Sequence, residues 1–145
     1  SRVYLALTEG HWSNQSKSGL IDRPIEKVPD CFNRYQVSDA GRPSRTEYEV
    51  LSEFSQEGTP FSLVRLKLQT GRTHQIRVHM ASLSHPLLGD SIYGHAGFLG
   101  FDRAALHSFE ITCQLPGCQE ATVFSSEMPI DFQKLITHSS SIPYL

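Results

Sequence analysis

The chain has 145 residues, of which 39% are hydrophobic and 19% are charged, and its formal net charge is −2. These values exclude an intrinsically disordered chain, and the short apolar runs exclude a membrane-spanning helix, which needs about 20 apolar residues. The length is that of one domain, so we expect residues 1–145 to form a single domain with a proper hydrophobic core.

The first half of the chain predicts a meander of antiparallel strands. Apolar and polar residues alternate over residues 2–8, 45–54 and 61–69, with the period of two that a half-buried strand requires. Residues 13–44 form a long polar connection, in which only residues 19–25 carry apolar content. A connection of this length without a clear element is unusual in a compact domain and is often functional.

The alternation also sorts the side chains of two strands by face. Arg2 and Tyr4 fall on the face opposite Val3, and Arg65 and Lys67 fall on the face opposite an apolar row. The apolar row of that second strand consists of Val64, Leu66 and Leu68.

A short helix is expected after residues 70–71, with Thr73 as its N-cap and an end before the His85-Pro86 pair. At 100° per residue its apolar stripe consists of Ile76, Met80 and Leu83. His74 and Arg77 share the opposite face, so the helix directs an imidazole and a cation away from its own apolar stripe.

The last third predicts a strand over residues 106–115, a paired strand over 121–125, a short helix from Pro129 to Ile136 and a frayed tail from residue 139. The predicted fold class is therefore α+β, with a mostly antiparallel or mixed sheet and few short helices.

The three cysteines, Cys31, Cys113 and Cys118, are too few for a disulfide scaffold. Three reduced thiols are the favoured interpretation, and a Cys113–Cys118 bridge across a hairpin is the alternative. No CxxC pair or HExxH motif is present, so we expect no metal site.

Charge is unevenly distributed along the chain. Residues 58–89 contain no acidic residue but contain Arg65, Lys67, Arg72 and Arg77. A cationic window in a slightly acidic protein favours a polyanion-binding face, and a solvated face balanced by acids elsewhere is the alternative.

Residues 68–81 read LQTGRTHQIRVHMA, and HPLLGD at 85–90 and YG at 93–94 follow. This pattern closely resembles the signature of RluA-type RNA pseudouridine synthases. Weaker matches to the same family occur in the expected order at residues 4–11 (YLALTEGH), 19–25 (GLIDRPI), 41–48 (GRPSRTEY) and 103–107 (RAALH). The resemblance covers about residues 2–136, and Arg42 and Ser44 depart from the Lys and Ala of the family pattern.

The resemblance implies a reaction that needs neither a metal nor an organic cofactor. The uridine is flipped out of its stack, its glycosidic bond breaks, and the ring is rejoined through carbon. Tyr4 matches the family tyrosine beside the flipped base, and Arg77 matches the arginine that pairs with the nucleophilic aspartate. Their structural alternatives are a core aromatic side chain and a surface arginine.

Further positions are candidate RNA contacts, with solvated surface positions as the alternative for the last four. They are Arg72, Thr73, His74, Gln75, Arg42, Arg45, Arg65 and Lys67. His74 is equally well interpreted as a structural hydrogen-bonding residue, and His79 and His85 are interpreted as structural.

One departure from the family pattern is large. The family nucleophile is an Asp within His-Arg-Leu-Asp-x-x-Thr-Ser-Gly, and these 145 residues do not contain that motif. Asp22 matches a different family segment, and Asp90 is expected to have a turn or capping role. We therefore expect a fold incomplete at its N-terminal side, with an open sheet edge. The resemblance implies that Arg77 pairs with a carboxylate that this chain does not supply. In this chain we therefore expect its guanidinium to contact solvent, an anion or another acidic residue.

The leading hypothesis is the C-terminal part of a cytoplasmic RNA pseudouridine synthase that acts on ribosomal or transfer RNA and is inactive as this chain alone. The alternative is a non-catalytic RNA-binding or ribosome-associated protein that retained the fold. A metal hydrolase is disfavoured, because His74 and His79 lie on different sides of the predicted helix.

Overall fold

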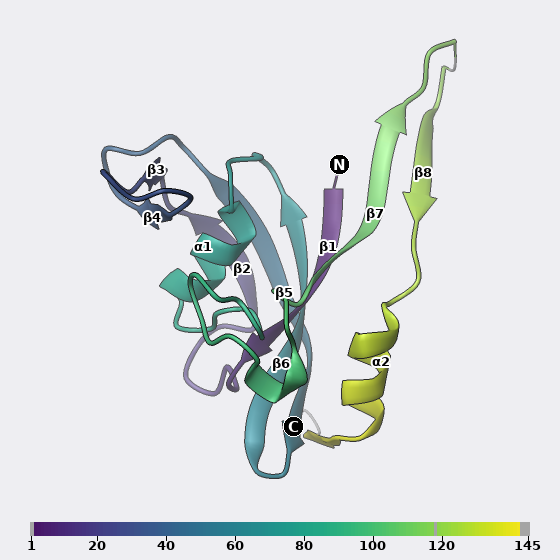
Figure 1. The fold of residues 1–145 in the computed structure, drawn as a ribbon. Coiled ribbons are helices and arrows are strands. Elements are labelled where there is room, and N and C mark those ends of the chain that lie inside the picture. Colours follow the sequence, from purple (N-terminus) through teal and green to yellow (C-terminus); the bar gives the residue numbers. More distant parts are fainter. Residues whose placement is uncertain (1, 118, 143–145) are drawn as a thin grey trace.

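The computed structural model describes residues 2–117 and 119–142. Its main sheet has the strand order β2-β5-β6-β1-β7-β8, with β9 pairing beside β5, and every pairing in it is antiparallel (Figure 1). The strands of this sheet are β1 (Arg2–Glu9), β2 (Ser18–Asp22), β5 (Arg45–Gln56), β6 (Thr59–Leu68), β7 (Leu106–Gln114), β8 (Ala121–Ser125) and β9 (Ser140–Ile142).

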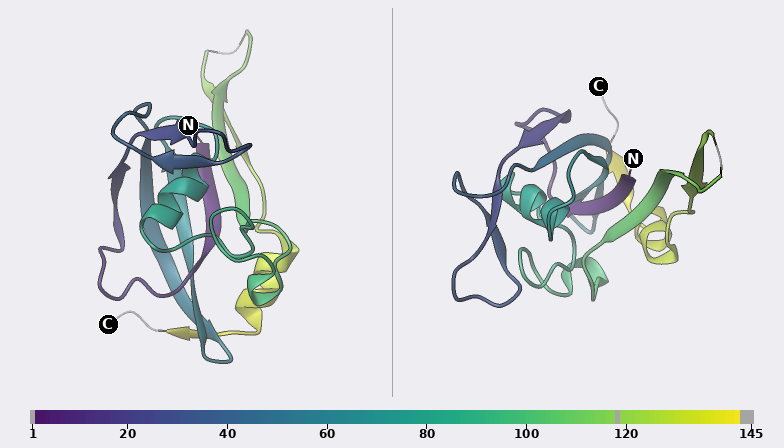
Figure 2. Two further views of the ribbon diagram at one scale, coloured as in Figure 1. Left: turned by 60° about the vertical axis from the view of Figure 1, so that its left-hand side comes forward. Right: turned by 90° about the horizontal axis from the view of Figure 1, so that it is seen from above.

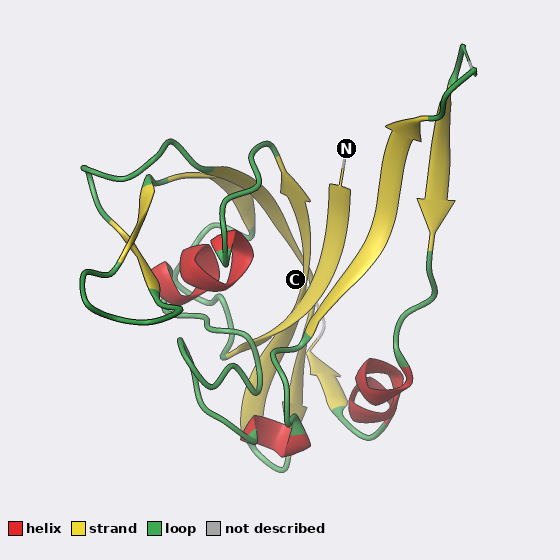
Figure 3. Ribbon diagram, turned by 45° about the horizontal axis from the view of Figure 1, so that its top comes forward, coloured by secondary structure: helices red, strands yellow, loops and turns green. Residues whose placement is uncertain are grey.

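A small hairpin and three short helical segments complete the described elements. The hairpin consists of β3 (Ile25–Lys27) and β4 (Tyr35–Val37). The helices are α1 (Gln75–Ser82), the 3-10 turn η1 (Phe98–Gly100) and α2 (Ile130–Thr137). Figure 3 shows that most of residues 83–105, between α1 and β7, is loop. The expected α+β class with a largely antiparallel sheet is confirmed.

The two α-helices lie on opposite faces of the sheet (Figures 1 and 2). On the α1 face, Ile76 and Met80 pack with strand residues that include Ala6, Val64 and Leu66. On the α2 face, the cluster contains Leu5, Leu7, Leu63, Phe132 and Leu135. Successive strand side chains point to opposite faces, so the alternation seen in the sequence feeds two separate hydrophobic cores.

The connection over residues 13–44 contains three strands, β2, β3 and β4, so the expectation of no clear element there is wrong. Ile21 and Ile25 are the buried hydrophobic residues of these strands, and such short segments show no periodicity. The tail is likewise less frayed than expected, because Ser140–Ile142 pairs with β5.

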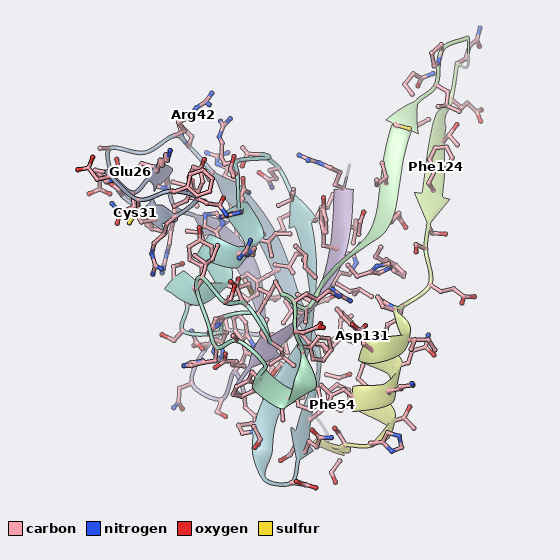
Figure 4. All side chains as sticks on the ribbon, in the orientation of Figure 1. Glu26, Cys31, Arg42, Phe54, Phe124 and Asp131 are labelled. Carbon is pink, nitrogen blue, oxygen red and sulfur yellow. The ribbon has the colours of Figure 1, made fainter. Side chains whose placement is uncertain are left out.

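In the described part of the chain the sheet has two open edges, one formed by β2 and β9 alongside β5 and the other by β8. β1 is interior and pairs with β6 on one side and β7 on the other. The β7–β8 hairpin projects from the body, and Phe124 of β8 is half-exposed there (Figures 1 and 4).

None of the described helices is long and apolar enough to cross a membrane. Cys31 and Cys113 are free thiols, so the Cys113–Cys118 bridge is wrong, and Cys118 itself lies outside the described residues.

Candidate active site

Tyr4 and Arg77, which the sequence pairs only through a resemblance, line one cavity of about 260 Å³. The cavity lies where the start of β1 and the end of β6 meet the N-terminal turn of α1. Its lining consists of Arg2, Tyr4, Leu68, Gly71, Arg72, His74, Gln75, Ile76, Arg77 and Leu106. Apolar walls with cations around them suit a flat base that carries a phosphate.

Asp90 is the ion-pair partner of Arg77. The guanidinium donates from Nε to Oδ2 and from Nη2 to Oδ1, both at 2.8 Å. Oδ1 also accepts the backbone N–H groups of Ile92 and Tyr93, at 3.0 and 3.1 Å. The Asp90 side chain is fully buried, and the Arg77 side chain keeps 20% of its exposure.

The expectation that this chain supplies no carboxylate to Arg77 is therefore wrong. The expectation that Arg77 contacts another acidic residue is confirmed, since that residue is Asp90. Asp90 has the expected turn role and holds the arginine as well. The loop after α1 folds back so that Asp90 contacts Arg77 of the helix. No periodic pattern in the sequence predicts such a contact.

The pair is ionised near neutral pH. The hydrogen bond to Asp90 is the main reason that the pKa of Arg77 is raised above its ordinary value. Burial alone would raise the pKa of Asp90, but the bonds from Arg77, Tyr93 and Ile92 outweigh it, and the pKa is lowered. Asp90 engages Nε and Nη2, and Nη1 has no hydrogen-bond partner among the described residues. Arg77 lines the cavity, and its Nη1 group can donate a hydrogen bond to a further acceptor.

Tyr93 joins this pair to the β3–β4 hairpin. Its ring packs against the guanidinium groups of Arg77 and Arg34, with Cζ 5.2 and 5.6 Å from the ring centroid. Its hydroxyl accepts the Tyr35 backbone N–H at 2.9 Å and is hydrogen-bonded to Nδ1 of His74 at 2.8 Å. Tyr93 thus links three separate segments of the chain, namely the β3–β4 hairpin, the start of α1 and the loop after α1.

His74 combines the two interpretations that the sequence left open. It has a structural bond to Tyr93, and it also lines the cavity. Burial, followed by the charge of Arg77, lowers the pKa of His74, so its imidazole is neutral near pH 7. His74 is also the N-cap of α1, in the left-handed region with φ 58° and without a capping side-chain bond. The expectation of Thr73 as the N-cap is wrong.

Gln75 has a structural role that the sequence did not indicate. It is 3% exposed, and its Oε1 accepts the Thr70 hydroxyl and the Arg72 N–H. Its Nε2 donates to the Arg45 carbonyl and to the Thr46 hydroxyl. This amide therefore fixes the turn before α1, and we do not include it among the proposed RNA contacts.

His79 and His85 have the structural surroundings that were expected. His79 is fully buried between the Thr46 hydroxyl and the Arg23 carbonyl, at 2.8 and 2.9 Å. His85 bonds the Glu9 carbonyl at 2.8 Å and stacks on Trp12. Within the described residues, no group of three or more His, Cys, Asp or Glu side chains is arranged to hold a metal ion.

A second cavity of about 400 Å³ lies beside the first, and Gly71 and Arg72 line both. Thr73, Arg42 and the β3–β4 hairpin form its other walls. Figure 4 shows Arg42 and Glu26 at the hairpin end of the molecule, away from Phe124. The two cavities together form a path from the Tyr4 pocket toward the hairpin.

Arg45, Arg65 and Lys67, the other predicted RNA contacts, do not line either of these two cavities. Arg65 and Lys67 line a cavity on the other side of the sheet, where Glu49 and Glu47 lie directly across from them on β5. Arg45 is half-exposed and pairs with Asp22 at 3.4 Å. The alternation of β6 already placed Arg65 and Lys67 opposite Leu66, and that signal could have separated them from Tyr4.

Three contributors to the site were missed at the level of sequence. Arg2 could have been found, because strand alternation puts it on the same face as Tyr4. The ion pair between Asp90 and Arg77 and the contacts of Tyr93 could not be predicted from sequence alternation. Both depend on how the loop after α1 folds back.

Comparison with known proteins matches this chain and its fold to one family. A family model described as RNA pseudouridylate synthase matches residues 1–82, and the chain belongs to this family.

Individual relatives agree with that assignment. The chain is 35% identical to ribosomal large subunit pseudouridine synthase D of Nitrosomonas europaea, over 99% of this chain and 42% of the relative. It is 40% identical to the uncharacterized RNA pseudouridine synthase YhcT of Bacillus subtilis, over 92% of this chain and 43% of that protein. The chain thus spans less than half the length of these curated relatives.

A solved structure, human RNA pseudouridylate synthase domain containing 1, aligns with a TM-score of 0.78 and 31% identity. That alignment covers 99% of this chain and 60% of the human one.

Proposed function

We propose that this chain is the C-terminal part of the catalytic domain of an RNA pseudouridine synthase that isomerises uridine in ribosomal or transfer RNA. The observation that carries the proposal is the shared cavity of Tyr4 and Arg77, in a chain of this family. The name of the Nitrosomonas europaea relative refers to the ribosomal large subunit, which favours ribosomal RNA and a cytoplasmic location.

The cavity suits the chemistry of that isomerisation. Tyr4 offers a ring face for the uracil and a hydroxyl that can relay a proton. The free Nη1 edge of Arg77 suits a carboxylate nucleophile, which an arginine keeps ionised. The reaction breaks the nitrogen–carbon glycosidic bond and forms a carbon–carbon bond within the same nucleotide, so no atom is gained or lost.

The proposed RNA contacts follow the two adjoining cavities. Arg72 lies between them, Arg42 and Thr73 line the hairpin side, and His74 lines the Tyr4 side. These contacts help to offset the few kcal/mol that flipping a base costs.

The nucleophile motif of the family is absent from these 145 residues, so we expect no catalysis by this chain alone. The test incubates the chain with uridine-containing RNA and measures both binding and pseudouridine. Binding without product supports the proposal. Substantial product would reveal another nucleophile, and absence of RNA binding would contradict the function itself.

The alternative is a non-catalytic RNA-binding or ribosome-associated protein. The same absent motif favours it, and the coding sequence upstream of Arg2 separates the two. A His-Arg-Leu-Asp stretch there supports the enzyme, whereas an in-frame start near residue 1 supports the binding protein.

A further inference from the structure

Arg2 is a cation of the Tyr4 cavity to which neither the sequence signature nor the comparisons assign a role. It lies on β1, paired with Leu68 of β6 and Ile111 of β7, and it is exposed. Residues two apart on a strand share a face, and both Arg2 and Tyr4 line the cavity.

Gly71 leaves room for the Arg2 guanidinium. A Cβ atom on Gly71 would lie 3.1 Å from Nη1 and 3.2 Å from Cζ of Arg2, and closer still to Nη2. The backbone of Gly71 is not left-handed, so free space is what this glycine supplies. Any larger residue there would displace the guanidinium.

Arg2 and Arg72 are the two cations of the cavity without an acidic partner among the described residues, since Asp90 neutralises Arg77. Arg72 is at least anchored, because its Nε donates to the neutral Pro43 carbonyl at 3.0 Å. Over residues 2–117 and 119–142, the Arg2 side chain has no hydrogen-bonded or ion-paired partner. An exposed guanidinium held beside a base-sized cavity, without a counter-ion, suits a phosphate oxygen.

We propose that Arg2 binds a backbone phosphate of the RNA at the mouth of the Tyr4–Arg77 cavity, in a position that Gly71 keeps open. This inference rests on the proposed function, because it takes the occupant of the cavity to be a nucleotide of RNA. Arg2 then fixes the strand that carries the target base and acts as a positioning residue.

The experiment measures binding of a fluorescein-labelled oligouridylate to the 145-residue chain by anisotropy over a range of salt concentrations. Arg2→Gln is expected to weaken binding about five-fold and to reduce the slope of log K against log salt by about 0.7, the loss of one phosphate contact. Arg2→Lys keeps the charge and is expected to retain most of the slope.

Gly71→Ala is the second variant, since it displaces the guanidinium without removing its charge. It is expected to weaken binding like Arg2→Gln, with little change in melting temperature, because the displaced atoms end a flexible side chain. The double variant should bind no more weakly than Arg2→Gln alone, since both changes remove one interaction. Lys134→Gln on α2 is the charge-matched control and is expected to bind like the wild type.

A methylphosphonate placed at each linkage of the oligouridylate in turn identifies the phosphate. One linkage is expected to weaken wild-type binding and to have no effect on Arg2→Gln. Equal sensitivity of all linkages in both proteins, or displacement by inorganic phosphate alone, would mean a non-specific anion site and would overturn the inference. If Arg2→Gln bound the oligouridylate as tightly as the wild type, only this inference would be overturned. If the wild type itself did not bind, the proposed function would be overturned as well.

Discussion

The carboxylate of Asp90 holds the guanidinium of Arg77 through two hydrogen bonds of 2.8 Å, although the residues lie thirteen positions apart. The same carboxylate closes the turn at residues 90–93, so one buried side chain fixes both the loop and the arginine. Asp90 thereby sets which edge of Arg77 remains available. A nucleophilic carboxylate would meet Nη1, and Asp90 would not have to leave.

Asp90→Asn is expected to destabilise the chain by about 2 kcal/mol. Breaking a buried ion pair from one side typically costs about 3–5 kcal/mol, and the remaining exposure of Arg77 lessens that cost here. Urea unfolding followed by circular dichroism measures the difference. Asp22→Asn, which breaks the exposed pair with Arg45, is the control and should cost less than about 0.5 kcal/mol. Equal costs for the two variants would show that the buried pair is not special.

The Asp90 contribution should disappear in acid. The pKa of Asp90 is lowered in the folded chain, so the unfolded chain takes up this proton first as the pH falls. The stabilisation is then complete well above the ordinary aspartate pKa of about 3.9 and is lost as the pH falls through the lowered folded value. The difference in unfolding free energy between wild type and Asp90→Asn should be constant from pH 7 to about 5 and shrink below about 4. A difference that grew in acid would contradict the assigned direction.

Regular alternation over several residues allowed β1, β5, β6 and β7 to be predicted, and β8 was predicted as the strand that pairs back after the turn at residues 116–117. The three strands between residues 13 and 44 could not be predicted in this way. β3 and β4 have three residues each, and their pairing depends on a hairpin docked on Tyr93. Local pattern carries no information about a partner that lies some 58 residues away.

The site residues also divide into those that the sequence could predict and those that depend on long-range contacts. Tyr4 and Arg77 were predicted from a family signature, and the structure brings them to one cavity. Arg2 was implicit in the alternation of β1, but its role needed the proximity of Gly71. Asp90 carried only a turn signal, because long-range ion pairs leave no periodic trace in a single sequence.

Thr46→Val is expected to cost about 2–3 kcal/mol of stability, because its hydroxyl serves two buried groups. The hydroxyl oxygen accepts Nε2 of Gln75 at 2.9 Å, and the His79 ring bonds it at 2.8 Å. A valine of similar shape leaves Nδ1 of His79 without a partner and leaves Nε2 of Gln75 with only its bond to the Arg45 carbonyl. A buried unsatisfied group costs about 1–3 kcal/mol. Thermal unfolding measures the loss. Thr46→Ser retains the hydroxyl and should recover most of the stability, and failure to do so would assign the effect to methyl packing.

Tyr93→Phe is expected to loosen the β3–β4 hairpin while leaving the rest of the chain in place. The ring that packs against Arg77 and Arg34 remains, but the hydroxyl that bonds Tyr35 and His74 is lost. Each of these two bonds contributes about 1 kcal/mol, so global stability should fall by no more than about 2 kcal/mol. Hydrogen exchange by mass spectrometry should show faster exchange in peptides that cover residues 25–37, with α1 and β6 unchanged.

Tyr48→Phe is the matched control, since its hydroxyl donates to the exposed Ser16 carbonyl at 3.1 Å and not to a residue of the hairpin. It should leave exchange in residues 25–37 as in the wild type. If Tyr93→Phe also left that exchange unchanged, the hydroxyl would not anchor the hairpin, and the hairpin would be held by the Arg34 bond to the Ile92 carbonyl instead. Faster exchange would show that one hydroxyl couples the hairpin beside Arg42 to the imidazole that lines the Tyr4 cavity.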